Sequence, residues 1–542
     1  VTQNATITNV HAYVDGDVSG VQQVGGLVGK LDAGSTVTNS SVHVVGTVSA
    51  TGAYSAGGIG SLEGVVNGLY VNADVSVSSS SGGGIGGGAI GQWIPSSASA
   101  AQLKGVSYVG NLSAEQYVGG LIGYVFAYSA TNLVIEDSSV IGNVAGNSSA
   151  AIGSFIGRSG SNISSVTVND SYSSASFTKG GSSHTPALVR NNTGTITTSN
   201  VLYDSTKSSY TATGTATAKT TGNLRTKQTF VDEGWSIQDV ANHDSGSPTD
   251  WLIDAVDGRN NGYPMNTFQL TPNVQDRPVS VSFNGAVGEK NVGDEVTYNN
   301  IDVYGNTALV TMTEEKNNSG VDDANAVGDL DTQAGPEIGT STSEDSFVYQ
   351  VEFKDLSGNS VVMRELIMTS TDIDGPTQDE FVVVGGISSY SLAASSLLSA
   401  TVVDGEYKFI ASAAADVADK PNWLQVGFDV VSTVLIAGGS TDRGGQVFFD
   451  FTRSDSYLGA NSVTTAVARP NYTISYDANG GTGTAPSDQT SDASITISTP
   501  SLVDANGANA FGWNTKSDGT GVTYLPGASV RPSYDLTLYA QY

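Results

Sequence analysis

The sequence predicts an all-β protein built from three consecutive modules. Only 14% of its residues are charged while Gly numbers 66, and Ser and Thr are abundant, so strand and turn formers outnumber helix formers. A glycine-rich motif repeats at a fixed step near the start, and longer stretches of apolar–polar alternation follow it. With 542 residues and 38% hydrophobic content, the chain is long enough for several folded cores.

The repeated motif is a pair of glycines among small apolar residues, and it recurs about every 32 residues. Its copies are VGGLVGK (Gly25, Gly26, Gly29), AGGIGSL (Gly57, Gly58), GGGAIGQ (Gly87, Gly88, Gly91), VGGLIGY (Gly119, Gly120, Gly123), IGSFIGR (Gly153, Gly157) and a degenerate sixth, TPALVRN. Units that bury a face only against their neighbours must stack. Paired glycines suit close backbone approach or a positive φ. We therefore expect residues 1–220 to form a β-solenoid, with ladders of Ser, Thr and Asn between its turns.

These motifs resemble the GLUG-type repeats of bacterial surface and exported proteins, whose core is present here as GGLVG and GGLIG. The following segment, LRTKQTFVDEGWSI…DWLIDAVDGRNNGYPM, resembles the tail that often follows such arrays. The resemblance implies that aromatic residues of this tail cover the exposed last turn of the solenoid. These residues are Trp235, Trp251 and Tyr263, together with Pro264. The capped solenoid is accordingly predicted to span residues 1–270.

Residues 271–469 lack the repeat and carry longer alternating strands, such as SFVYQVEFKDL, SVVMRELIMTSTDID and QVFFDFTR. Alternation of apolar and polar residues indicates a sheet with one solvated face, and an antiparallel β-sandwich is the natural interpretation. The polar stretch EEKNNSGVDDANAVGDLDTQAGPEIGTSTSED is expected to be a long exposed loop.

Residues 470–542 contain YDANGG from Tyr476, Gly512-Trp513-Asn514, Pro526-Gly527 and LYA from Leu538. The segment closely resembles the Listeria–Bacteroides repeat, the B-repeat of internalin-type surface proteins. The resemblance implies a small β-grasp-like module of a cell-surface protein. Tyr542 stands where Trp is more usual in the family, which should not disturb the fold. From the residues alone, ANGG is a hairpin turn signal, and Trp513 with Phe511 on one strand is core material.

Charge and composition exclude several classes of partner. The net charge of −30 without a basic stripe argues against nucleic acid and against anionic membranes. The chain has no cysteine, so disulfides and thiolate metal sites are excluded. Since no apolar run approaches the ~18 residues of a membrane span, we expect no membrane insertion of this segment. No signal peptide or sorting tail is visible, and export signals are expected to lie outside the sequence.

The residues that carry chemistry are few, and we expect no catalytic site. His11 and His43 lie one repeat apart and would suit a metal site on adjacent turns, although exposed or laddered side chains are favoured. The glycines of GGGIGGGAIG at 82–91 are explained by the repeat rather than by phosphate binding. Acids of the solenoid fall at different phases of the repeat, so stacking is not expected to bring them together. They are Asp15, Asp17, Glu63, Asp74, Glu136, Asp137 and Asp170.

Tyrosines of the solenoid could stack on sugars. However, strand propensity and partial burial explain most of them. The aromatic residues also do not recur regularly at the repeat step, so they do not predict a stacked row of rings. The tyrosines are Tyr54, Tyr70, Tyr108, Tyr117 and Tyr124.

One metal site is predicted in the sandwich, within TSTDIDGPTQDEF. Four acids surround the Gly375-Pro376 turn, and hard oxygen ligands beside a reversing glycine suit Ca²⁺. The spacing departs from an EF-hand, and a solvated turn between strands is the competing interpretation. The predicted ligands are Asp372, Asp374, Asp379 and Glu380.

Together these features predict a non-catalytic, structural or adhesive segment of a bacterial cell-surface protein, located extracellularly. Its expected partner is an unknown surface receptor or glycan, or copies of itself. Two other function classes stay open: a subunit of a self-assembling surface layer or filament, and a carbohydrate-active enzyme on the solenoid.

Overall fold

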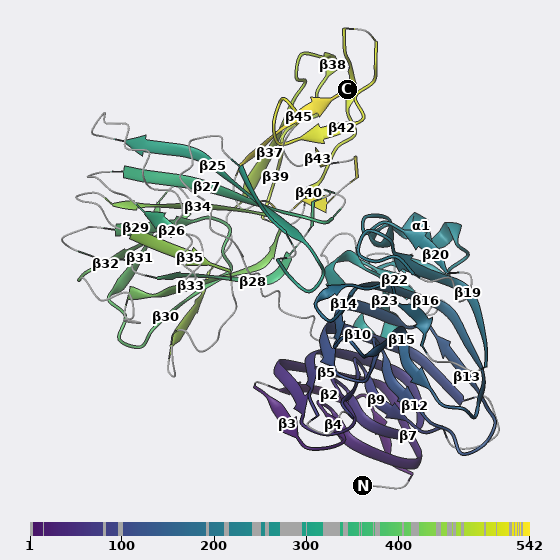
Figure 1. Ribbon diagram of the computed structural model, residues 1–542. Helices are drawn as coiled ribbons and strands as arrows, with labels where there is room; N and C mark the ends of the chain where they lie inside the picture. The colour runs from purple at the N-terminus through teal and green to yellow at the C-terminus, as the bar shows by residue number, and fades with distance from the viewer. Residues whose placement is uncertain are drawn as a thin grey trace. The chain divides into compact units, whose positions relative to one another are not determined.

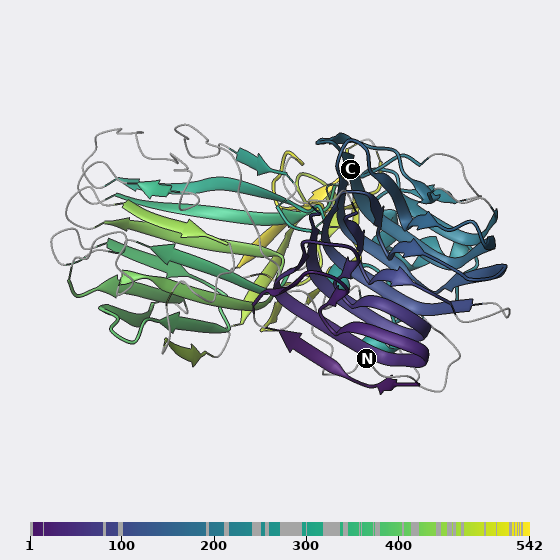
Figure 2. The same ribbon diagram turned by 60° about the horizontal axis from the view of Figure 1, so that its bottom comes forward.

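The architecture was obtained as a computed structural model (Figures 1 and 2). It has two compact units, Val1–Asp254 with Gly262–Arg277, and Ala255–Asn261 with Pro278–Tyr542. The residues that the structure describes are 4–14, 16–79, 83–95, 101–190, 194–210, 216–240, 251–254, 259–270, 295–299, 301–317, 337–339, 345–356, 358, 360–361, 363–371, 373, 375, 380–403, 406–413, 422–440, 446–451, 458, 462–467, 471–492, 495–505, 507–519, 523–524, 526–527, 529–530, 532 and 535–542.

The all-β prediction is confirmed, and the first unit is a β-solenoid of about six turns. Figure 1 shows its turns stacked from the N-terminal strands, in purple, to the teal strands β19 and β20. Its strands are β1 (Thr6–Thr8), β2 (His11–Val14), β3 (Val18–Gly20), β4 (Val24–Gly25), β5 (Val28–Ala50), β6 (Ser55–Ala56), β7 (Ile59–Val77), β8 (Ile85–Gly87), β9 (Ile90–Trp93), β10 (Ala101–Ala114), β11 (Tyr117–Gly119), β12 (Ile122–Val125), β13 (Thr131–Glu136), β14 (Ser139–Gly146), β15 (Ala151–Ser159), β16 (Ile163–Lys179), β17 (Ser182–Ser183), β18 (Ala187–Val189), β19 (Thr195–Asp204) and β20 (Thr217–Lys219).

Successive turns pair in parallel, strand over strand. For example, β13 and β14 both pair with β10 on one side and with β16 on the other. In the same way β15 pairs with β11 and β12 before it and with β18 after it. Inward side chains of these strands form one continuous core of Val, Leu and Ile from Val24 to Val201. Each turn therefore buries its apolar face only by contact with its neighbours, as a stacked repeat requires.

The paired glycines stack in register, which confirms the repeat and its step. Gly119 lies opposite Gly87 in the turn before and opposite Gly153 in the turn after. The degenerate sixth copy is also in place, because Ala187 lies opposite Gly153. A Cβ on Gly119 would fall on the Ile122 carbonyl oxygen, so the motif needs glycine because backbones approach closely there.

A second file of residues forms a corner between two strand runs of each turn. One residue per turn has a positive φ, a conformation that Gly, Asn and Asp tolerate best. We call this file the corner file; its members are Asn9, Asn39, Gly68, Gly105, Asp137, Asp170 and Asn200.

Polar side chains also form ladders from turn to turn, as predicted. The Ser139 hydroxyl donates to the Ser107 hydroxyl over 2.9 Å, and Asn143 Nδ2 donates to Asn111 Oδ1 over 2.8 Å. Because each rung satisfies a polar group beside the stacked strands, the ladders add register specificity to the apolar core.

The segment that follows the solenoid strands forms short elements. They are η1 (Asn223–Arg225), α1 (Lys227–Asp232), β21 (Ile237–Asp239), β22 (Trp251–Ile253), η3 (Arg259–Gly262), β23 (Met265–Asn266) and η4 (Thr267–Leu270). Trp235 does cover the last turn, since its Nε1 donates to the Asn200 carbonyl over 3.0 Å. The implied cap is wrong for the other aromatics, which lie along the flank of the solenoid.

We call residues 251–254 and 262–270 the flank strap. Trp251 and Tyr263 pack on Tyr172 of β16, with ring centroids at 5.7 and 6.3 Å. Trp251 Nε1 donates to Asp137 Oδ1 over 3.1 Å, which holds the strap against the corner file. The strap follows the flank because Tyr172 supplies a buried aromatic surface there.

The second unit begins with two antiparallel sheets that face each other across a shared core, so the β-sandwich is confirmed. One sheet has the order β24-β25-β27-β34-β29-β32-β31 and the other β26-β35-β28-β33-β30-β36. The strands are β24 (Glu295–Tyr298), β25 (Thr307–Asn317), β26 (Glu337–Gly339), β27 (Asp345–Lys354), β28 (Met363–Thr371), β29 (Glu380–Val384), β30 (Ser389–Leu392), β31 (Leu398–Val403), β32 (Glu406–Ala411), β33 (Leu424–Val431), β34 (Thr433–Ser440), β35 (Gln446–Asp450) and β36 (Val463–Ala466).

The C-terminal module has its own core around Trp513, which is fully buried as expected. The expectation is wrong for Phe511, which precedes the strand that carries Trp513 and is 56% exposed. Its main sheet has the order β39-β37-β45-β42-β43, in which β37 and β45 pair in parallel. In the predicted turn, Asn479 and Gly480 both have a positive φ. The strands are β37 (Tyr472–Asp477), β38 (Thr482–Thr484), β39 (Gln489–Ser491), β40 (Ile495–Thr496), β41 (Ser501–Val503), β42 (Gly512–Asn514), β43 (Thr523–Tyr524), β44 (Ser529–Val530) and β45 (Leu536–Gln541).

A buried ion pair lies at the end of β27 in the sandwich. Glu352 is 2% exposed, and Lys354 Nζ lies 4.0 Å from its Oε2. Thr515 donates to Glu352 Oε1 over 3.2 Å, and Gln350 donates to the same oxygen. Burial raises the pKa of the Glu352 carboxyl, although the charge of Lys354 and these hydrogen bonds oppose the rise. Two opposing effects therefore act on the ionised carboxylate: desolvation disfavours its charge, and the attraction of Lys354 favours it.

Replacing Lys354 with methionine is expected to make the stability of this unit depend on pH. The variant loses the charge that opposes the rise in the Glu352 pKa, so the folded state holds this proton more tightly than the unfolded state. A raised folded pKa gives stability that is present below the pKa of the unfolded state and is lost as pH rises through the pKa of the folded state. Between pH 5 and 8, urea unfolding should show the variant losing about 1 kcal/mol or more relative to the parent. The double variant Glu352→Gln, Lys354→Met should lose this extra dependence, and a parallel decline in all three chains would contradict the prediction.

Candidate functional site: an aromatic ridge on the solenoid

The aromatic residues of GYVFAYS lie on the outer surface of the solenoid. Strand alternation turns Val125 and Ala127 into the core and leaves Tyr124 and Phe126 half-buried. Tyr128 follows at the next outward position and is 76% exposed. A backbone bond from Phe126 to the Trp93 carbonyl, 2.9 Å long, continues the pairing of this segment with the turn before. The segment therefore presents a row of rings on a fixed backbone.

The rings contact one another along the row. Tyr117 and Tyr124 have centroids 5.8 Å apart, Tyr124 and Phe126 lie 6.4 Å apart, and Phe126 and Tyr128 meet edge-to-face at 5.0 Å. Arg158 of β15 lies with its guanidinium 4.6 Å from the Tyr117 ring centroid and 5.9 Å from that of Tyr124. These cation–π contacts fix both rings from the neighbouring turn. We call Tyr117, Tyr124, Phe126 and Tyr128 the aromatic ridge.

The ridge combines apolar faces with neutral hydroxyl groups. Burial, and to a lesser degree the nearby Tyr54, raises the pKa of the Tyr124 phenol, so this hydroxyl stays protonated at neutral pH. An amphipathic surface of this kind can stack on the flat faces of sugar rings or other planar groups while its hydroxyls form hydrogen bonds. Because two of the rings are held by Arg158, less conformational freedom is lost on binding than with free side chains.

The sequence analysis identified only part of this ridge. Tyr70 and Tyr108 lie in strands as expected, but they are fully buried rather than partially buried. Tyr117 and Tyr124 lie on the ridge, but Phe126 and Tyr128 were not recognised. The period-two spacing in YVFAY was the available signal, because it puts three rings on one outward face. These three rings lie along one turn, so they do not recur from one copy of the repeat to the next, and a comparison of successive copies does not reveal them.

The two histidines do not form a stacked pair. Register places His43 opposite Tyr13, and their rings lie 5.2 Å apart, whereas His11 lies opposite Ser41. His11 Nδ1 lies 2.9 Å from the Ser41 hydroxyl, and His43 Nδ1 lies 3.0 Å from Asn72 Nδ2. The expectation of laddered side chains is thereby confirmed for both histidines. Among the described residues, the structure shows no group of three side chains that could hold a metal ion.

The acids of the solenoid hold structural positions. Asp17 and Asp74 each accept a backbone N–H from the next turn, at 2.7 Å. The expectation that the acids fall at different phases is wrong for Asp137 and Asp170, which both belong to the corner file. The two acids lie 33 residues apart, about one step of the repeat, so their shared phase was already visible in the sequence. Asp137 bonds Trp251, and Asp170 accepts from Asn200 Nδ2 over 2.8 Å.

Three of the predicted calcium ligands, Asp372, Asp374 and Asp379, lie outside the described residues. Glu380 is described: it begins β29, is 2% exposed and lies opposite Ser440. Gly375 is buried, and a Cβ there would fall on the Ala411 carbonyl oxygen. Close approach thus explains this glycine without a cation, and the calcium site stays a prediction.

A β-solenoid joined to further β modules fits a structural or adhesive role. Residues 472–541 match the Listeria-Bacteroides repeat domain, a family that occurs in bacterial surface proteins, and this match supports a bacterial surface protein. No curated protein matches the chain. The likeness of the solenoid repeats to GLUG-type repeats stays a prediction. Among the described residues, the structure contains no helix with the length and apolar character needed to span a membrane.

Proposed function

We propose that this chain is a non-catalytic, adhesive segment of a bacterial cell-surface protein, located extracellularly, and that the aromatic ridge contacts its target. The observation that carries the proposal is the row of four contacting rings on the outside of a stacked scaffold. A solenoid and sandwich joined to a surface-repeat domain would hold such a ridge away from the cell. Large, rigid aromatic side chains supply contact area at low entropic cost, which suits adhesion.

The surroundings of the solenoid acids support a non-catalytic role. A glycosidase needs two carboxyl groups facing one bond of the substrate, with one of them held as an acid. Asp17, Asp74 and Asp170 instead accept hydrogen bonds from the neighbouring turn, which ties them to the stacking of the scaffold. This use of the carboxylates favours a binding surface over a hydrolytic site.

The test measures attachment of beads that carry the purified chain to immobilised glycans, mucin and host-cell surfaces. The variant Tyr124→Ser, Phe126→Ser, Tyr128→Ser should lower attachment at least tenfold, because stacking surface is lost. The matched control Val402→Ser, Val403→Ser changes exposed residues of the sandwich and should attach normally. Equal attachment of the ridge variant and the parent, with unchanged melting curves, would refute the assignment. Attachment that depends instead on binding between copies of the chain would favour a self-assembling layer.

We also propose that the acidic segment that contains Asp372 and Asp374 binds Ca²⁺ and stiffens the sandwich. Binding to the folded state alone adds about 1.4 kcal/mol of stability when calcium is at ten times its Kd. For a weak extracellular site the relevant concentrations are on the order of 10⁻⁴–10⁻³ M or above. Calorimetry should show the melting temperature of the sandwich rising in millimolar calcium, and not rising in the Asp372→Ala, Asp374→Ala variant. A melting curve that is the same with calcium and with chelator would sink the proposal.

A further inference from the structure

The corner file contains a hollow where two successive turns carry glycine. Asn39 precedes Gly68 and Gly105 in the file, and Asp137 follows them. Since the two glycines lack side chains, a pocket of about 250 Å³ opens between Asn39 and Asp137. A Cβ on Gly105 would meet backbone atoms of Gly68 at 3.4 Å and Asn266 Oδ1 at 3.7 Å, which are ordinary contacts, so a side chain can start there without a clash.

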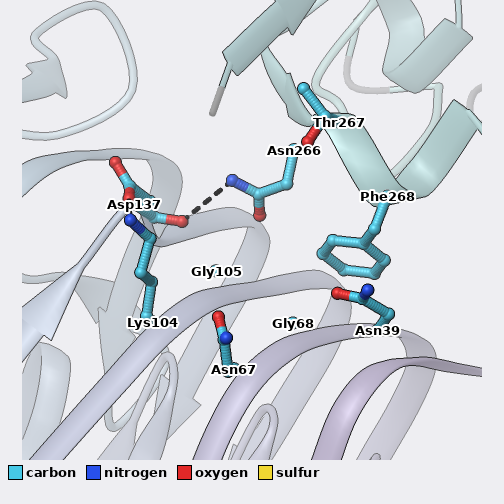
Figure 3. A pocket seen from close by; sticks show the side chains of 9 residues that line it. All are labelled: Asn39, Asn67, Gly68, Lys104, Gly105, Asp137, Asn266, Thr267 and Phe268. Atoms are coloured by element: carbon cyan, nitrogen blue, oxygen red, sulfur yellow. Dashed lines mark hydrogen bonds and ion pairs between the residues drawn. The ribbon is translucent and has the colours of Figure 1, made fainter. Parts of the chain in front are cut away.

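The flank strap closes one side of this hollow. Figure 3 shows the Phe268 ring above the amide of Asn39, while Asn67 and Lys104 rise from the solenoid strands on the other side. Asn266 of β23 also lines the pocket, and its Nδ2 donates to the Asp137 carbonyl over 3.1 Å. The pocket thus brings together one aromatic ring, three amides and an ion pair.

The charged groups of the pocket balance each other. Lys104 Nζ lies 3.1 Å from Asp137 Oδ2, and the other oxygen of Asp137 accepts from Trp251 Nε1. The Asp137 side chain is 6% exposed and the Lys104 side chain 32%, so the ammonium reaches the opening. A locally neutral pocket in a chain of net charge −30 offers little attraction to an anion.

We propose that this pocket binds one neutral sugar ring. Each sugar hydroxyl both donates and accepts, and therefore matches side-chain amides and a paired ammonium and carboxylate. The exposed amides of Asn39 and Asn67 are placed for such bonds, and Phe268 offers an apolar face to the C–H groups of the ring. The volume lies below the ~300–1,000 Å³ of sites for drug-sized ligands, which suits one ring. The site is separate from the aromatic ridge and does not depend on the adhesive role of the ridge.

The experiment fills the hollow without altering the residues around it. In Gly105→Asn the new side chain occupies the pocket, and asparagine is already tolerated at this position of the corner in other turns, as at Asn39. Gly181→Asn is the matched control, because Gly181 also has a positive φ and its Cβ would meet nothing within 4 Å. Asn67→Ala is a second variant that removes one exposed amide from the pocket.

Binding is measured by saturation-transfer NMR on the full chain with glucose, galactose, mannose and N-acetylglucosamine at millimolar concentration, and with glucuronate for comparison. At least one neutral sugar should give transfer to the parent and to Gly181→Asn. Its Kd should rise at least tenfold in Gly105→Asn and several-fold in Asn67→Ala, with melting curves unchanged. Transfer from no neutral sugar, equal transfer to Gly105→Asn, or a preference for glucuronate would each overturn the proposal. A ridge variant that loses attachment but keeps this transfer would support two separate sites.

Discussion

Replacing Gly119 with alanine is expected to lower the free energy of unfolding of the solenoid by about 3 kcal/mol or more. The added methyl group would fall on the Ile122 carbonyl oxygen and on the Gly157 amide nitrogen of the next turn. Both are backbone atoms, one in the same turn and one in the next, so no side chain can rotate away and the backbone itself must shift. Thermal unfolding followed by circular dichroism should show a melting temperature lower by about 6–12 °C.

Gly83→Ala is the matched control for this experiment. A Cβ at Gly83 would meet only the Ser79 hydroxyl, at 3.9 Å. The same chemical change there should be neutral or slightly stabilising, because alanine restricts the unfolded chain. If both variants melt like the parent, close backbone approach is not what requires glycine in the repeated motif.

Truncating Trp251 to alanine should destabilise the first unit by about 3–5 kcal/mol, the usual loss for a fully buried tryptophan. The residue is 2% exposed, and its ring lies 5.1 Å from Trp235 and 5.7 Å from Tyr172. The change also removes the hydrogen bond that the indole N–H donates to Asp137. We expect the flank strap to detach, and limited proteolysis should then cut the chain there well before the solenoid is digested.

Trp251→Phe separates the two contributions of this side chain. It keeps most of the aromatic packing but not the hydrogen bond, so it should cost only about 1–3 kcal/mol, because Asp137 is buried and charged. Tyr128→Ala serves as the surface reference, since a ring that is 76% exposed contributes little to folding. A strap that resists proteolysis equally in all three variants would show that Trp251 does not anchor it.

Features that depend on local pattern and regular spacing could be predicted from the sequence. The glycine pairs around Gly87, Gly119 and Gly153 fixed the solenoid and its step, because each turn of such a fold repeats the same backbone geometry. Alternation likewise indicated the strands of the sandwich, and Trp513 with its glycine-rich surroundings indicated the C-terminal module.

Which side chains meet across the turns depends on how the turns stack in three dimensions, and the sequence did not reveal it. The corner file, with its hollow at Gly68 and Gly105, could not be read from spacing because the loops between its members differ in length. The position of the flank strap depends on a surface built by distant residues such as Tyr172, so local sequence does not specify it. The aromatic ridge depends on both the local sequence pattern and the stacking of the turns. Alternation turns its rings outward, and the next turn supplies Arg158, which holds two of them.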